Sequence, residues 1–156
     1  MKTAPTEPSL AIPRPPDWEP VRFGDYYAPV RVVMINDRLR DPTTKRGPLA
    51  LVGMDELTGK AKTPEEALDW ELRALKTQFF WQTTEKVCGH PSVTVAYAGR
   101  KDPRLRNTTR VVSVEVDGRL YAAIVTTMST RPDDRTYLAA QQAMLDGFVV
   151  EYVSRA

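Results

Sequence analysis

Cysteine and histidine are almost absent from this chain. Its 156 residues include one cysteine, Cys88, and one histidine, His90. An internal disulfide needs two cysteines and a structural zinc site needs four nitrogen or sulfur ligands, so both are excluded. A Cys–His catalytic pair is disfavoured as well, because residues this close together in a Gly-Pro turn do not face each other as nucleophile and base. The better interpretation of Gly89-His90-Pro91 is a tight turn before a strand.

An excess of charge of one sign and long apolar runs are also missing. The 22 basic and 20 acidic residues give a net charge of +2, without the strong basic excess typical of a nucleic-acid-binding protein. No apolar run approaches the ~20 residues that a membrane-spanning helix needs. Residues 1–10 lack the apolar core of a signal peptide. We expect no nucleic-acid partner and no transmembrane segment. We expect the protein to be extracytoplasmic if an export signal was removed, and cytoplasmic otherwise. Its oligomeric state stays open.

Catalytic and phosphate-binding motifs are missing too. There is no G-x-S-x-G sequence and no glycine-rich phosphate loop. The densest basic stretch, Arg100 to Arg106 followed by Arg110, has no interleaved aromatic residues and is predicted to be a solvated loop. Carboxylate pairs such as Glu65/Glu66 fit the first turns of helices, where they complement the helix dipole. We therefore expect no enzyme, no metal and no cofactor, although folding could still bring distant carboxylates together.

Proline, by contrast, is concentrated at the start of the chain. Six of the 13 prolines lie within the first twenty residues, at positions 5, 8, 13, 15, 16 and 20. Proline disfavours both helices and central strands. We predict a flexible tail over residues 1–8, a single domain over residues 9–153 and a short tail over residues 154–156. Within the domain, Pro13 to Pro20 forms a polyproline-like segment that brings Trp18 onto the domain.

Alternating and β-branched runs predict strands along most of the chain. Asp117-Gly118 is a strong two-residue hairpin signal, because glycine accepts a positive φ. Residues 120–127 are apolar on both faces, which is typical of a central strand covered on both sides. The predicted core strands are residues 30–35, 49–54, 81–87, 92–97, 112–116 and 120–127, with shorter strands at residues 9–12 and 148–153.

Two segments carry helix signals. Thr63-Pro64-Glu65-Glu66 combines an N-cap, a first-turn proline and a capping box, and the helix is expected to end near Phe80. Its apolar stripe is Leu68, Leu72, Leu75 and Phe79. A second helix is predicted over residues 132–146, with Gly147 in the left-handed position that follows a helix. Because strands run together instead of alternating with helices, the predicted fold is α+β, a mainly antiparallel sheet of about six strands with helices packed against it.

Aromatic residues away from these stripes are candidates for binding. Trp70 points opposite the leucine stripe of the first helix, on the side of Arg73. The preferred interpretation is that a second layer covers Trp70; the alternative is an exposed anchor, since tryptophan beside arginine is the composition of a binding hot spot. The candidate binding surface consists of Trp70, Arg73, Tyr26, Tyr27 and Trp18.

The ordered set of segments resembles a known family. Ile12-Pro13-Arg14-Pro15-Pro16-Asp17-Trp18 is similar to the apolar-Pro-x-Pro-Pro-x-Trp start of the LpqN/LpqT lipoprotein family of mycobacteria and relatives, which includes the proline-rich secreted antigen. The match continues over most of the domain through Leu57-Thr58-Gly59, Thr63 to Leu68, Phe80 to Thr84, Gly89-His90-Pro91 and Leu145-Asp146-Gly147-Phe148.

This resemblance implies a PsbP-like fold, an antiparallel sheet between helices, and a role in binding or assembly. It carries no motif of catalytic residues. It implies a non-catalytic binding or accessory protein of the mycobacterial cell envelope or secretome that recruits a protein partner or a lipid-like ligand. Family members usually begin with an export signal, which this sequence does not show. The alternatives are a cytosolic accessory factor for secretion that shields an apolar client segment, and an enzyme that uses carboxylates gathered by the fold.

Overall fold

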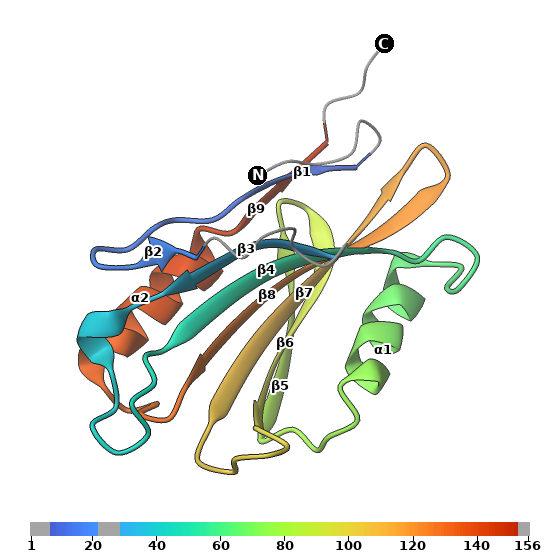
Figure 1. The fold of residues 1–156 in the computed structure, drawn as a ribbon. Helices are drawn as coiled ribbons and strands as arrows, with labels where there is room; N and C mark the ends of the chain where they lie inside the picture. Colours follow the sequence, from blue (N-terminus) through green and yellow to red (C-terminus); the bar gives the residue numbers. More distant parts are fainter. Residues whose placement is uncertain (1–6, 22–28, 153–156) are drawn as a thin grey trace.

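The computed structural model describes residues 7–21 and 29–152, and its centre is a seven-stranded antiparallel sheet with the strand order β2-β3-β4-β8-β7-β6-β5 (Figure 1). A two-stranded sheet pairs β1 with β9. The strands are β1 (Ser9–Ala11), β2 (Glu19–Pro20), β3 (Val30–Ile35), β4 (Leu49–Glu56), β5 (Trp81–Val87), β6 (His90–Ala98), β7 (Arg106–Val116), β8 (Arg119–Ser129) and β9 (Val149–Glu151). The helices are η1 (Asp37–Leu39), α1 (Pro64–Ala74) and α2 (Arg135–Asp146).

The predicted α+β class with a mainly antiparallel sheet is confirmed. The main sheet has seven strands where about six were expected, and it includes the two-residue strand β2. Helix α1 packs on one face of the sheet, while α2 and the β1–β9 pair cover the other, as Figure 1 shows. The sheet is thus covered on both sides by elements from different parts of the chain.

Strand β8 lies at the centre of the sheet, as its apolar sequence predicted. It pairs with β4 on one side and β7 on the other. Tyr121, Ala123 and Val125 face the core beneath β1 and β9. Leu120 and Ala122 face the core beneath α1. A strand buried on both faces in this way explains why the sequence shows no polar alternation there.

Helix α1 begins where the capping box predicted and ends earlier. The Glu66 backbone N–H donates to Thr63 Oγ1 at 3.1 Å, and the Glu66 carboxylate accepts from the Lys62 N–H at 2.8 Å. The helix ends at Ala74, not near Phe80, because Lys76 adopts a left-handed φ of 50°. The apolar stripe continues beyond the helix: Leu75 and Phe79 still pack on the core beneath α1.

Helix α2 is capped by Asp134, whose carboxylate accepts from the Tyr137 N–H at 2.9 Å. The left-handed conformation predicted for Gly147 is wrong, because its φ is −92°. Glycine is needed there for a different reason. A Cβ at this position would lie 2.3 Å from Cγ of Pro13 and 2.9 Å from the carbonyl oxygen of Ala143. Gly147 therefore allows the proline-rich segment, Pro13 to Pro20, to approach the end of α2.

Both tight hairpins are two-residue turns. Asp117 and Gly118 have φ values of 48° and 77°, which confirms the predicted turn. The other turn is formed by Cys88 and Gly89, with φ values of 52° and 81°, so it starts one residue earlier than expected. His90 is the first residue of β6 and pairs with Val87.

The interpretation of the basic stretch as a solvated loop is wrong for its C-terminal part. Strand β7 begins at Arg106, and Arg110 lies buried within it. Its Nε donates to Thr94 Oγ1 at 2.9 Å, and its guanidinium also bonds the carboxylate of Glu85 and the carbonyl oxygen of Leu145. Burial of this charge is offset by these partners, and Arg110 belongs to no basic surface patch.

Candidate functional site

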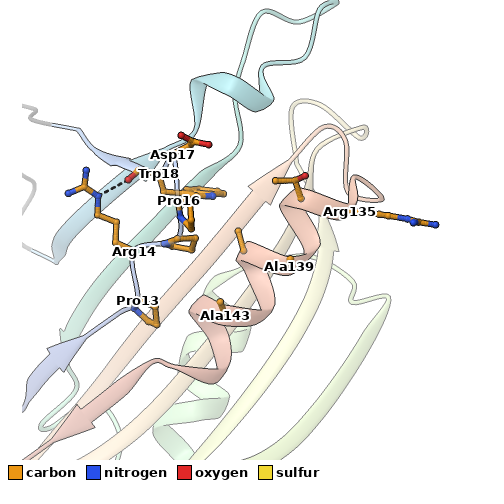
Figure 2. A pocket seen from close by; sticks show the side chains of 11 residues that line it. Pro13, Arg14, Pro16, Asp17, Trp18, Arg135, Ala139 and Ala143 are labelled. Atoms are coloured by element: carbon orange, nitrogen blue, oxygen red, sulfur yellow. Dashed lines mark hydrogen bonds between the residues drawn. The ribbon is translucent and has the colours of Figure 1, made fainter.

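A groove runs between the proline-rich segment and the outer face of α2, and Figure 2 shows its lining side chains. Its volume is about 540 Å³, within the range of roughly 300–1,000 Å³ that ligand sites in proteins occupy. The proline-rich segment forms one wall and α2 the other. The lining residues are Pro13, Arg14, Pro15, Pro16, Asp17, Trp18, Arg135, Thr136, Ala139, Ala140 and Ala143.

Trp18 anchors the proline-rich wall of this groove. Its side chain is buried, only 1% exposed, and its ring centroid lies 6.5 Å from that of Tyr137 on α2. Met34, Ala50, Ala140 and Met144 complete the cluster around it. Trp18 is therefore a buried anchor at the base of the groove that it lines, and its part in binding stays a prediction.

Polar contacts fix the turn that carries Trp18. The Trp18 N–H donates to the carbonyl oxygen of Pro15 at 3.2 Å, and its own carbonyl accepts from Arg14 Nε at 2.8 Å. Asp17 takes a left-handed φ of 69°, and its carboxylate lies 3.3 Å from Nε of Arg38. Proline residues limit the remaining backbone freedom. The wall is therefore held in place before anything binds, which lowers the entropic cost of binding.

The interior of the groove is apolar, and its charged groups lie at the rim. Ala139 and Ala143 are exposed on α2 and leave the groove open because their side chains are short. In Figure 2 the guanidinium groups of Arg14 and Arg135 extend away from the groove. Such a surface can bury apolar groups of a ligand and offers few directional polar contacts.

Trp70 and Arg73 lie elsewhere, on α1 at the opposite face of the sheet. Trp70 is 39% exposed, so the preferred interpretation that a second layer covers it is wrong. The proline-rich segment cannot cover it, because that segment packs on α2. Lys60 Nζ lies 6.0 Å from the Trp70 ring centroid, and Arg73 is exposed one turn further along. Tyr26 and Tyr27 fall outside the described residues. Of the three described candidates, Trp18 lies on the other face of the sheet from Trp70 and Arg73.

A pair of carboxyl groups lies beneath α1. Glu71 is buried, and one of its oxygens, Oε1, has no hydrogen-bond partner among the described residues. Burial, together with a hydrogen bond to Asp55 and the negative charge of that residue, raises the pKa of Glu71 to about 8, against the opposing effect of Lys60. Glu71 is therefore protonated near neutral pH. Neither residue lines the groove.

Sequence reasoning named the proline-rich segment but missed the α2 wall. The signal was present in the spacing of Thr136, Ala139 and Ala143, which puts small side chains on one helical face. The prediction for this helix followed its apolar residues, of which Tyr137 and Met144 pack inward. The spacing of these small residues does not show which segment they face, because the proline-rich segment lies more than a hundred positions away in the chain.

This arrangement defines a PsbP-like α+β protein with a surface groove. Among solved structures it is similar to LpqN, which is involved in cell envelope biogenesis of Mycobacterium tuberculosis. The TM-score is 0.74 at 15% sequence identity, covering 96% of this chain and 87% of LpqN.

Two further structures share the fold. A Pseudomonas aeruginosa protein of unknown function gives a TM-score of 0.56 at 15% identity, covering 89% of this chain and 98% of that protein. The PsbP protein of the cyanobacterium Synechocystis gives 0.53 at 14% identity, with 94% of each chain covered. No family model and no curated protein matches the sequence. The similarity to LpqN therefore concerns the fold. In the described ranges, no helix is long and apolar enough to cross a membrane.

Proposed function

We propose that this chain is a non-catalytic binding or accessory protein of the cell envelope, and that the groove beside α2 holds its protein partner or lipid-like ligand. The observation that carries the proposal is the groove itself, an apolar cleft of about 540 Å³ between two preformed walls. The structural similarity to LpqN, a protein involved in cell envelope biogenesis, supports an extracytoplasmic site of action.

The chemistry of the lining supports binding over catalysis. The groove pairs no nucleophile with a base: its titratable side chains are Arg14, Asp17 and Arg135. A nucleophile without a general base within hydrogen-bond reach is weak at neutral pH. We propose that apolar burial against proline and alanine, not reaction, is what this surface provides.

The Asp55–Glu71 pair is the arrangement that best fits the alternative of a carboxylate-dependent enzyme. A raised pKa and a shared proton are features of catalytic carboxyl pairs. Here Glu71 is turned inward beneath α1. We propose a structural role, in which the hydrogen bond from Glu71 to Asp55 holds α1 on β4.

The groove is tested by blocking it. Ala139→Arg places a long side chain in the groove, whereas Leu138→Arg introduces the same side chain next to it, at a position that does not line the groove. The probe is a fluorescent fatty acid, which is titrated into each purified variant. In a second experiment, native mass spectrometry of protein purified from its host detects a bound protein or lipid.

We expect Ala139→Arg to weaken binding at least tenfold and Leu138→Arg to leave it unchanged. Equal loss in both variants would show that binding does not involve the groove. If the host-purified protein carries a protein and the fatty acid does not bind, the partner is a polypeptide. Absence of both kinds of ligand would refute the proposal.

A further inference from the structure

Strand β5 is an open edge of the main sheet. It lies last in the strand order, and no described strand pairs with its outer side. Every side chain from Trp81 to Lys86 is exposed, so neither face of the strand is packed into the core. At the opposite edge, β2 is two residues long and ends in Pro20. Short strands and prolines protect sheet edges from unwanted pairing, and β5 has neither form of protection.

The hairpin geometry identifies which backbone groups of β5 are free. The two-residue turn at Cys88-Gly89 makes Val87 and His90 a hydrogen-bonded pair. Hydrogen-bonded and non-bonded pairs alternate along an antiparallel ladder. The N–H and C=O groups of Gln82, Thr84 and Lys86 therefore point away from β6. The pairing of Lys86 with Pro91, which has no N–H to donate, agrees with this assignment.

The sequence of β5 is complementary to itself in the antiparallel direction. Aligned about Thr84, the strand places Thr84 opposite Thr84 of a second copy and Gln82 opposite Lys86. These pairs use the free backbone groups, and each exchanges both hydrogen bonds. On the other face, Trp81 meets Val87 and Thr83 meets Glu85. No like charges stand opposite each other, and Thr–Thr and aromatic–β-branched pairs are favourable across strands.

We propose that β5 pairs with β5 of a second copy of this chain, joining the two main sheets about a two-fold axis at Thr84. A two-fold interface requires a surface that complements itself, as this strand does. The pairing covers Trp81, which is 47% exposed in the single chain and lies beside Phe80, itself 59% exposed. It leaves the groove beside α2 free, so it does not depend on the function proposed for that groove.

The strength of this dimer is limited by its size. Seven residues at about 3.3 Å each give a contact roughly 23 Å long and one strand wide. Stable specific interfaces bury about 1,200–2,000 Å², and we expect a single strand pair to bury less. The dimer is therefore weak and concentration-dependent, with a dissociation constant in the micromolar to millimolar range. The measurement is sedimentation velocity of the purified chain over about 1 µM to 1 mM.

Variants at Thr84 test the register. Thr84→Lys and Thr84→Glu each place like charges opposite one another at the axis, so each alone should be monomeric, with a dissociation constant raised at least tenfold. An equimolar mixture of the two should dimerise again, because opposite charges then meet. Thr84→Val, which keeps the backbone groups and adds no charge, should still dimerise. Circular dichroism confirms that each variant is folded.

Cross-linking gives a second measurement of the same contact. In a Cys88→Ser background, Thr84→Cys places two thiols across a hydrogen-bonded pair, where Cα atoms lie about 5.5 Å apart, a separation that suits a disulfide. Gln82→Cys in the same background lies opposite Lys86 and should not cross-link. A wild-type chain that stays monomeric at every concentration would overturn the proposal. Cross-linking through Gln82→Cys equal to that through Thr84→Cys would also overturn it, as would a mixture of Thr84→Lys and Thr84→Glu that does not dimerise.

Discussion

Arg110 Nη1 donates a hydrogen bond of 2.7 Å to the carbonyl oxygen of Leu145. This contact joins the middle of β7 to the last turn of α2. Carbonyl groups at the C-terminal end of a helix lack partners within the helix, and a cation there also complements the helix dipole. Because the guanidinium also bonds Thr94 and Glu85, one side chain connects β5, β6, β7 and α2.

We expect Arg110→Met to destabilise the fold by about 2–4 kcal/mol, because it removes the hydrogen bonds of the guanidinium to the Leu145 carbonyl, the Thr94 hydroxyl and the Glu85 carboxylate. The matched control is Arg119→Met, since Arg119 is exposed and lies 3.5 Å from Glu56 in a surface ion pair. Such pairs contribute about 0–1 kcal/mol. Urea unfolding measures both changes. Equal stability of the two variants would contradict the proposed role of Arg110.

Trp18 carries an indole N–H that is buried without a hydrogen-bond partner among the described residues. Trp18→Ala should cost about 3–5 kcal/mol, because it leaves a cavity against Tyr137. Trp18→Phe should cost much less, roughly 1 kcal/mol, since removal of the unpaired N–H offsets part of the lost packing. Thermal unfolding distinguishes them; similar losses in both variants would indicate that the N–H is satisfied in solution.

The raised pKa of Glu71 predicts a pH-dependent stability. A carboxyl group with an ordinary pKa of 4.5 when unfolded and about 8 when folded binds more protons in the folded state between those values. The free energy of unfolding therefore falls as pH rises from about 4.5 to 8, by at most ~1.4 kcal/mol per pH unit. Glu71→Gln should remove this slope and stabilise the protein at pH 8.

The control for that measurement is Glu65→Gln, at an exposed position in the first turn of the same helix. It should retain the fall in stability between pH 4.5 and 8. Urea unfolding at several pH values measures the free energy of unfolding of each variant. If this free energy depends on pH in Glu71→Gln as it does in the unmodified chain, Glu71 does not bind its proton more tightly in the folded state than in the unfolded state.

Gly147 is expected to accept no side chain while Pro13 is present. Gly147→Ala should destabilise the fold by about 1–3 kcal/mol, because its Cβ would overlap the proline ring. Pro13→Ala removes the ring atom nearest to that Cβ, so the double variant should lose less than the sum of the two single losses. Urea unfolding of the four chains measures the coupling. Strictly additive losses would show that the two residues do not meet.

Local patterns predicted the local structure of this protein well. The capping box set the start of α1, and the apolar run of residues 120–127 identified the central strand β8. The end of α1 was missed because Leu75 and Phe79 keep the helical spacing after the helix has ended. Their burial on the sheet, a tertiary contact, produced the pattern that looked like a longer helix.

The candidate site depended on contacts that no local pattern contains. The burial of Arg110 follows from partners on three other elements, and none of these partners is near it in the sequence. The exposure of Trp70 depends on which face of the sheet the proline-rich segment covers. The Asp55–Glu71 pair joins residues of β4 and α1 that carry no shared motif. These features arise from the order of the strands in the sheet, which local sequence patterns do not reveal.

The pairing of β1 with β9 has a consequence for how this protein becomes competent to bind. Leu10 pairs with Val150, almost the full length of the described chain away. Closing a loop of this length costs more entropy than closing the hairpins of the main sheet, so we expect this contact to form after them. The groove wall at Pro13 follows directly from β1. We therefore expect the groove to exist only in chains whose two ends have paired, and a partner that enters it to select folded molecules over partly folded ones.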